Sequence, residues 1–197
     1  MAEPGVVDGS WRGIDELAAL VGAYSWVENR IFEVCGVWAT APGRAGGGAL
    51  DPASRVWCAG VSRRHGELAL RWAERLPFRA QVDRAALVAA PAGPLAAALE
   101  ALGAEPDARV GVATLVGWVL PGVLRVYGAH LRTGSSVSEA PVLEVLAGAH
   151  RDLAVEIRHG DALLEASADG LTRDASLGAE FELALRKTPV FPAGHTS

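Results

Sequence analysis

The sequence predicts an all-α protein, a four-helix bundle in which one long crossover joins the second helix to the third. Apolar residues recur every three or four positions along four long stretches, and no stretch shows the alternation or tight turns of a sheet. Val61–Ala69 and Leu146–Ala154 resemble each other, since each sets a histidine in a helical apolar pattern and follows it with an acid, Leu and Ala. Leu20–Phe32 and Leu115–Tyr127 share a fainter likeness, in the same order. We therefore expect two related helical hairpins, each turning one histidine toward the interior.

The first hairpin is predicted over residues 14–38 and 52–76. Apolar side chains repeat at helical spacing through the first of these stretches, which indicates one buried face of a long helix. The glycine-rich stretch 41–48 ends it, because glycine and proline disfavour a regular helix. Asp51 followed by Pro52 is typical of a helix start, with a side-chain cap and proline in the first turn.

The second hairpin follows a connection that is too long for a turn. Residues 77–108 hold several prolines around a short amphipathic piece at 95–102, and we expect this connection to run the length of the bundle. A third helix is predicted at about 108–131, apolar on most sides and kinked by Pro121. The fourth is predicted at about 138–168.

The chain of 197 residues is long enough for one domain with a sizeable core. We expect a flexible leader at 1–12, a single helical domain at 13–187 and a loose tail at 188–197. An amphipathic stretch at 177–185 is expected to pack on the outside of the bundle. Trp11, Trp26 and Trp118 lie off the main apolar stripes, which indicates an extra buried surface such as a homodimer interface.

The bulk charge and apolar pattern narrow the choice of partners. A net charge of −5 disfavours a surface built for nucleic-acid phosphates. No apolar run reaches the roughly 20 residues that span a bilayer, and the first residues lack signal-peptide features, so we expect a cytoplasmic protein. Cys35 and Cys58 fall at one height of the first hairpin, where a disulfide is geometrically conceivable. Two buried, reduced thiols are the preferred interpretation for a cytoplasmic chain.

The chain resembles the ferritin-like superfamily, most nearly the bacterial branch similar to tRNA-modifying diiron hydroxylases. The resemblance covers roughly residues 14–166 and rests on the helix order, the long crossover, the duplicated hairpins and the positions of Glu28, His65 and His150. In that family each hairpin supplies a glutamate from its first helix and a Glu-x-x-His pair from its second, and two iron ions lie between them. The resemblance does not supply a tRNA substrate, because a fold hosts many functions.

Matching the family pattern position by position implies a degenerate diiron site. Ser62, Val123 and Ala147 stand where the family has glutamates, so three of its four carboxylates are absent. Without those oxygen ligands a conventional dinuclear iron site is not expected. One carboxylate and two histidines remain, a ligand set that suits a single iron or manganese ion. The remaining metal ligands implied by the resemblance are Glu28, His65 and His150.

Two functions follow from this comparison. One is a metal-dependent, non-haem iron oxidoreductase or hydroxylase acting on a small-molecule substrate. The other is a metal-free ferritin-like bundle that binds a small ligand or a protein partner, with the histidines kept as buried, hydrogen-bonded groups. Glu156 and His159 form a Glu-x-x-His sequence, but we interpret their helix face as solvated. Tyr24 and Tyr127 are expected near the centre, chiefly as core residues.

Overall fold

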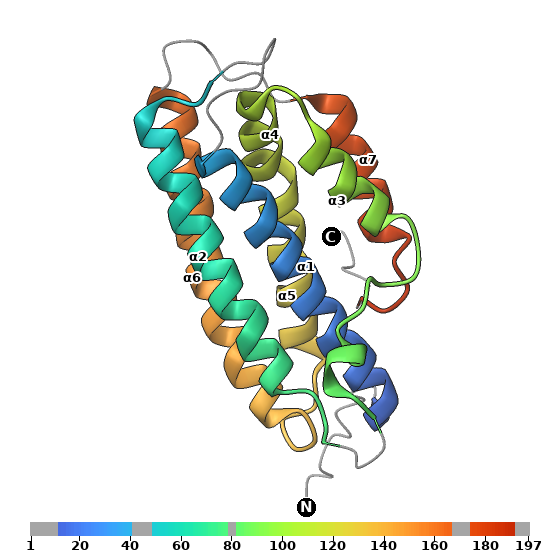
Figure 1. The fold of residues 1–197 in the computed structure, drawn as a ribbon. Helices are drawn as coiled ribbons and strands as arrows, with labels where there is room; N and C mark the ends of the chain where they lie inside the picture. The colour runs from blue at the N-terminus through green and yellow to red at the C-terminus, as the bar shows by residue number, and fades with distance from the viewer. Residues whose placement is uncertain (1–11, 41–48, 79–81, 167–173, 192–197) are drawn as a thin grey trace, which may run out of the picture.

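Long helices running side by side make up the fold (Figure 1). The structure is a computed structural model that describes residues 12–40, 49–78, 82–166 and 174–191, and every regular element within these ranges is helical. The prediction of an all-α protein is confirmed.

The first hairpin consists of α1 (Ile14–Thr40) and α2 (Pro52–Glu74), which pair along most of their length. Asp51 caps α2, because its carboxylate accepts a hydrogen bond from the Ser54 backbone N–H at 2.9 Å. The predicted start of this helix is therefore confirmed, and its end lies two residues before the predicted one. The glycine-rich stretch 41–48 lies outside the described residues.

The connection between the hairpins contains two short helices, η1 (Arg84–Leu87) and α3 (Leu95–Ala104). The Arg84 guanidinium donates hydrogen bonds to two carbonyl groups in the last turn of α2 and to that of Leu76 just beyond it, and so satisfies orphan acceptors at the end of that helix. The carbonyl group of Leu87 lies directly over Gly22 of α1, where a β-carbon would overlap it. Glycine is thus what allows η1 to approach α1 this closely.

The third long helical run is divided into α4 (Ala108–Thr114), a π-helical turn η2 (Leu115–Val119) and α5 (Leu120–Thr133). Pro121 follows the π-helical turn directly. Proline has no N–H and its ring clashes with the preceding turn, so a wider turn at this place accommodates it. The irregularity predicted at Pro121 therefore takes the form of an expanded turn just before it.

The second hairpin is completed by α6 (Ala140–Ala166), which packs against α5 and also lies along α2 (Figure 1). The last helix, α7 (Ala175–Arg186), packs across η2 and α3. Gly178 of α7 leaves room for the Trp118 ring, and Phe181 is buried. The predicted amphipathic stretch therefore contributes to the core as well as covering it.

The run from Ala108 to Thr133 is long and apolar enough to cross a membrane by length and composition alone. Within the fold, 67% of its most apolar window is buried by the surrounding helices. A helix surrounded by neighbours on most sides has this composition because nearly every side chain meets apolar partners.

Residues just outside both ends of the predicted domain, 13–187, contact the helices. Residues 1–11 and 192–197 of the predicted leader and tail lie outside the described residues. Arg12, placed in the leader, is joined by hydrogen bonds to the Glu139 carboxylate. Thr188 and Phe191, placed in the tail, pack on the fold: Thr188 is buried and the Phe191 ring stacks on Tyr24.

Both cysteines are free thiols in the core, as the preferred interpretation held. Burial raises the pKa of Cys35 well above its usual value, and burial likewise raises the pKa of Cys58 to about 12. Thiolate is the reactive form, so both side chains act as small apolar core residues.

Candidate functional site

A buried carboxylate and a buried imidazole meet at the centre of the fold. Glu28 of α1 is 0% exposed and His65 of α2 is 3% exposed. Glu28 Oε2 pairs with His65 Nδ1, and the hydroxyl group of Tyr127 on α5 donates to Glu28 Oε1. The Trp72 indole N–H in turn donates to the Tyr127 oxygen at 3.2 Å. The structure thus brings together two of the three predicted metal ligands, and both oxygens of the Glu28 carboxylate have a partner.

A second carboxylate approaches the same imidazole from α6. Glu156 is 4% exposed, its Oε2 lies 3.6 Å from His65 Nε2, and its Oε1 accepts a hydrogen bond from Arg64 at 2.8 Å. The interpretation of this helix face as solvated is therefore wrong for Glu156, while His159 is exposed. Val145 and Ala149, at helical spacing before Glu156, are buried and were the signal that could have placed it inside.

The two carboxylates determine the charge of the imidazole. Burial alone would lower the pKa of His65, but Glu28 and Glu156 together outweigh burial and raise that pKa to about 10. Burial would raise the pKa of Glu156, but His65 and Arg64 outweigh it and hold that pKa below its usual value. Burial, followed by the nearby Glu28 charge, raises the pKa of Tyr127, so its phenol remains a donor. At neutral pH the centre therefore holds an imidazolium between two carboxylates.

A pocket of about 100 Å³ opens beside this imidazolium, which is enough for several water molecules. Ten side chains from α1, α2 and α6 line it: Glu28, Arg64, His65, Glu67, Leu68, Arg71, Ala149, Asp152, Leu153 and Glu156. His65 Nε2 is buried and has no hydrogen-bond partner among the described residues. Its 3.6 Å separation from Glu156 is longer than a normal hydrogen bond.

The third predicted ligand lies elsewhere. His150 is partly buried on α6, and a β-carbon added to Gly128 of α5 would be 3.3 Å from His150 Nε2. His150 does not line the pocket beside His65. Over the part of the chain that the structure describes, no group of three or more His, Cys, Asp or Glu side chains is placed to hold a metal ion. The metal centre stays a prediction of the resemblance.

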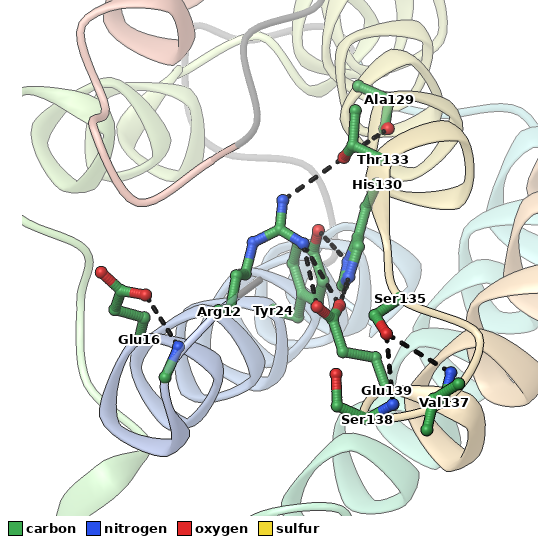
Figure 2. Close-up of polar contacts among 11 residues, drawn as sticks. Arg12, Glu16, Tyr24, Ala129, His130, Thr133, Ser135, Val137, Ser138 and Glu139 are labelled. Carbon is green, nitrogen blue, oxygen red and sulfur yellow. Dashed lines mark hydrogen bonds and ion pairs between the residues drawn. The ribbon is translucent and has the colours of Figure 1, made fainter. Parts of the chain in front are cut away.

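A second buried polar cluster closes the end of the fold near the α5–α6 turn (Figure 2). His130 Nδ1 lies 3.0 Å from the Tyr24 hydroxyl and His130 Nε2 lies 2.6 Å from Glu139 Oε2. Arg12 adds hydrogen bonds from its Nη1 to both Glu139 oxygens, at 3.2 and 3.3 Å, and one from its Nη2 to the Thr133 hydroxyl oxygen. A neutral imidazole satisfies this arrangement, with Nε2–H donating to Glu139 and Nδ1 accepting from Tyr24.

This cluster should make the stability of the protein fall on mild acidification. Burial lowers the pKa of His130 below its usual 6.5, because its effect outweighs the hydrogen bond to Glu139. Below pH 6.5 the unfolded chain therefore takes up a proton at this residue that the folded chain resists. The stabilising contribution is present above that pH and is lost as the pH falls, at no more than about 1.4 kcal/mol per pH unit.

Urea denaturation at several pH values between 7 and 5 measures this dependence. The variant His130→Gln should have a lower stability throughout and should lose less stability than the parent as the pH falls through this window. His65 contributes with the opposite sign, because its folded pKa is raised above the usual 6.5, but it does so equally in both proteins, so the difference between their slopes measures His130 alone. An equal slope in the variant and the parent would show that His130 titrates normally.

Comparisons with known proteins give no family for this chain. No family model matches it, and neither a curated protein nor a solved structure does. The ferritin-like resemblance therefore stays a prediction, and the function follows from the side chains at the centre of the fold.

Proposed function

We propose that the chain is a ferritin-like helical bundle that has lost its metal chemistry and binds a small polar molecule in the pocket beside His65. The order of the elements supports the first part, because α1 pairs with α2, α5 pairs with α6, and a long connection joins the two hairpins. Glu28 and His65, two positions carried over from the family pattern, face each other at the centre. Their contacts with the second hairpin are made by Tyr127 and Glu156, which are not positions of the family pattern.

One observation carries the binding proposal: a buried imidazole nitrogen, His65 Nε2, borders a pocket and makes no hydrogen bond within the described residues, with its nearest carboxylate oxygen 3.6 Å away. A buried polar atom left unsatisfied costs about 1–3 kcal/mol, so a native structure seldom keeps one without a role or a solvent molecule. The opposite ring nitrogen is held by Glu28, which fixes the ring in one orientation. A ligand atom that accepts a hydrogen bond from His65 Nε2–H would meet a preorganised donor.

The competing function is the metal-dependent oxidoreductase or hydroxylase implied by the resemblance. It requires Glu28, His65 and His150 to share a metal ion, whereas Glu28 and His65 are bonded to each other and His150 adjoins α5. A small-ligand site needs no such convergence. The arrangement of the donors therefore favours the binding protein over the metalloenzyme.

The test uses the full chain, purified without chelators or a histidine tag. Metal analysis should find no stoichiometric iron or manganese. A panel of small polar molecules, including acetate, methylammonium, glycine and phosphate, is then titrated while the ¹⁵N resonances of the His65 ring are followed by NMR. At least one compound should shift them saturably.

Pocket-filling variants provide the control. Ala149→Leu and Leu68→Trp place extra volume in the pocket and leave Glu28 and His65 unsubstituted, and either should abolish the shift while the rest of the spectrum stays that of a folded protein. A stoichiometric metal that is lost in His65→Ala would overturn the proposal in favour of the metalloenzyme. The absence of saturable binding by every compound would overturn it as well.

A further inference from the structure

The pocket beside His65 offers charges of both signs that the protein leaves unused. Arg71 on α2 and Asp152 on α6 both line it, and neither has an ion-pair or hydrogen-bond partner within the described ranges. His65 Nε2 adds a buried nitrogen that makes no hydrogen bond within those ranges, although the Glu156 carboxylate lies 3.6 Å from it. The pocket therefore presents a free guanidinium, a free carboxylate and an imidazole nitrogen to whatever enters it.

The other charged side chains of the pocket are already paired. Glu156 accepts from Arg64 at 2.8 Å, and Glu67 accepts from Arg63 at 2.7 Å on the exposed side of α2. Each of these pairs is neutral, so it attracts neither a simple cation nor a simple anion strongly. The charges that remain unpaired are the Asp152 carboxylate on α6 and the Arg71 guanidinium on α2.

We propose that the ligand is a small zwitterion, a molecule with one carboxylate and one ammonium group and the size of the smallest amino acids. This inference rests on the proposed function and specifies its ligand. The ligand carboxylate accepts hydrogen bonds from the Arg71 guanidinium, and the ligand ammonium donates to the Asp152 carboxylate, so that the ligand lies beside the His65 ring. A guanidinium binds a carboxylate well because its N–H groups form a planar fork.

The physical reason for a zwitterion is that it can pair with Arg71 and with Asp152 at the same time. A lone carboxylate would be repelled by Asp152, and a lone ammonium would be repelled by Arg71. A molecule that carries both groups meets an opposite charge at each end. The pocket volume of about 100 Å³ limits it to a few non-hydrogen atoms.

The experiment compares glycine with its two halves, acetate and methylammonium, at equal ionic strength. Saturation of the His65 ring ¹⁵N shift gives the dissociation constant. For glycine we expect a value on the order of millimolar, because a ligand of about five atoms has a small maximum binding free energy. Acetate and methylammonium should each bind at least about tenfold more weakly, since each can form only one of the two ion pairs.

Charge variants locate the site. Arg71→Gln and Asp152→Asn should each weaken glycine binding about tenfold or more, and both side chains are exposed, so the fold should tolerate the changes. Arg75→Gln, at the C-cap just after α2, and Glu144→Gln on α6 are matched controls outside the pocket and should leave the dissociation constant unchanged.

The outcomes separate this inference from the proposed function. Acetate or phosphate binding as tightly as glycine would overturn the zwitterion and leave a small-anion site, with the proposed function intact. Glycine binding that neither Arg71→Gln nor Asp152→Asn weakens would also overturn it. If glycine does not bind, the inference is wrong, and the wider panel decides the proposed function separately.

Discussion

Replacing Glu28 with alanine should lower the free energy of unfolding by about 3–5 kcal/mol, the cost of removing one member of a buried charge pair. The substitution strands two buried groups at once, because His65 Nδ1 and the Tyr127 hydroxyl both use the Glu28 carboxylate. Urea denaturation followed by circular dichroism measures the change at neutral pH, where His65 carries a charge.

Glu67→Ala is the matched control for this prediction. Glu67 also belongs to an ion pair, with Arg63 on α2, but its side chain is 58% exposed, so its loss should cost less than about 1 kcal/mol. The double variant Glu28→Leu/His65→Leu should recover part of the loss, since apolar side chains of similar size replace a buried pair at little cost. Equal effects of Glu28→Ala and Glu67→Ala would contradict the buried arrangement.

Gly22→Ala should destabilise the protein by about 1–3 kcal/mol or more through overpacking. A β-carbon at this position would overlap the carbonyl group of Leu87, which belongs to backbone and cannot turn aside as a flexible side chain can. The substitution therefore forces η1 away from α1. Thermal denaturation should show a lower midpoint.

Gly148→Ala is the same chemical change and should have the opposite effect on stability. Gly148 also lies inside a long helix, α6, but a β-carbon there would meet no atom within 4 Å among the described residues. Alanine has the higher helix propensity, so this variant should be more stable by up to about 1 kcal/mol. A loss of stability at Gly148, or none at Gly22, would show that these glycines differ from the packing described.

Much of the fold could be predicted from local patterns. The helical spacing of apolar residues predicted the long helices, and Asp51 with Pro52 predicted the start of α2, because these signals are carried by neighbouring residues. The π-helical turn was not predicted, since proline at position 121 indicates an irregularity without specifying its form. The contact of Gly22 with Leu87 joins residues far apart in sequence and had no local signal.

The candidate site was predicted in part. Glu28 and His65 lie together as the family pattern required, and they belong to one hairpin, so their pairing follows from α1 packing on α2. Glu156 was missed because a charged residue on a helix face is usually solvated, and only contacts with Arg64 and His65 on another helix hold it inside. His150 shows the reverse: its pattern matched that of His65, but side-chain direction depends on how α6 rotates against α5.

The charged groups at the centre also fix the position of the two hairpins relative to each other along their long axis. Glu28 and His65 come from the first hairpin, while Tyr127 and Glu156 come from the second, so the network is complete only in one alignment. Sliding α6 along α2 by one turn, about 5.4 Å, would separate Glu156 from both Arg64 and His65 and leave ions buried without partners. Apolar side chains alone would tolerate such a displacement more readily. The polar interior therefore gives the assembled halves a single axial register.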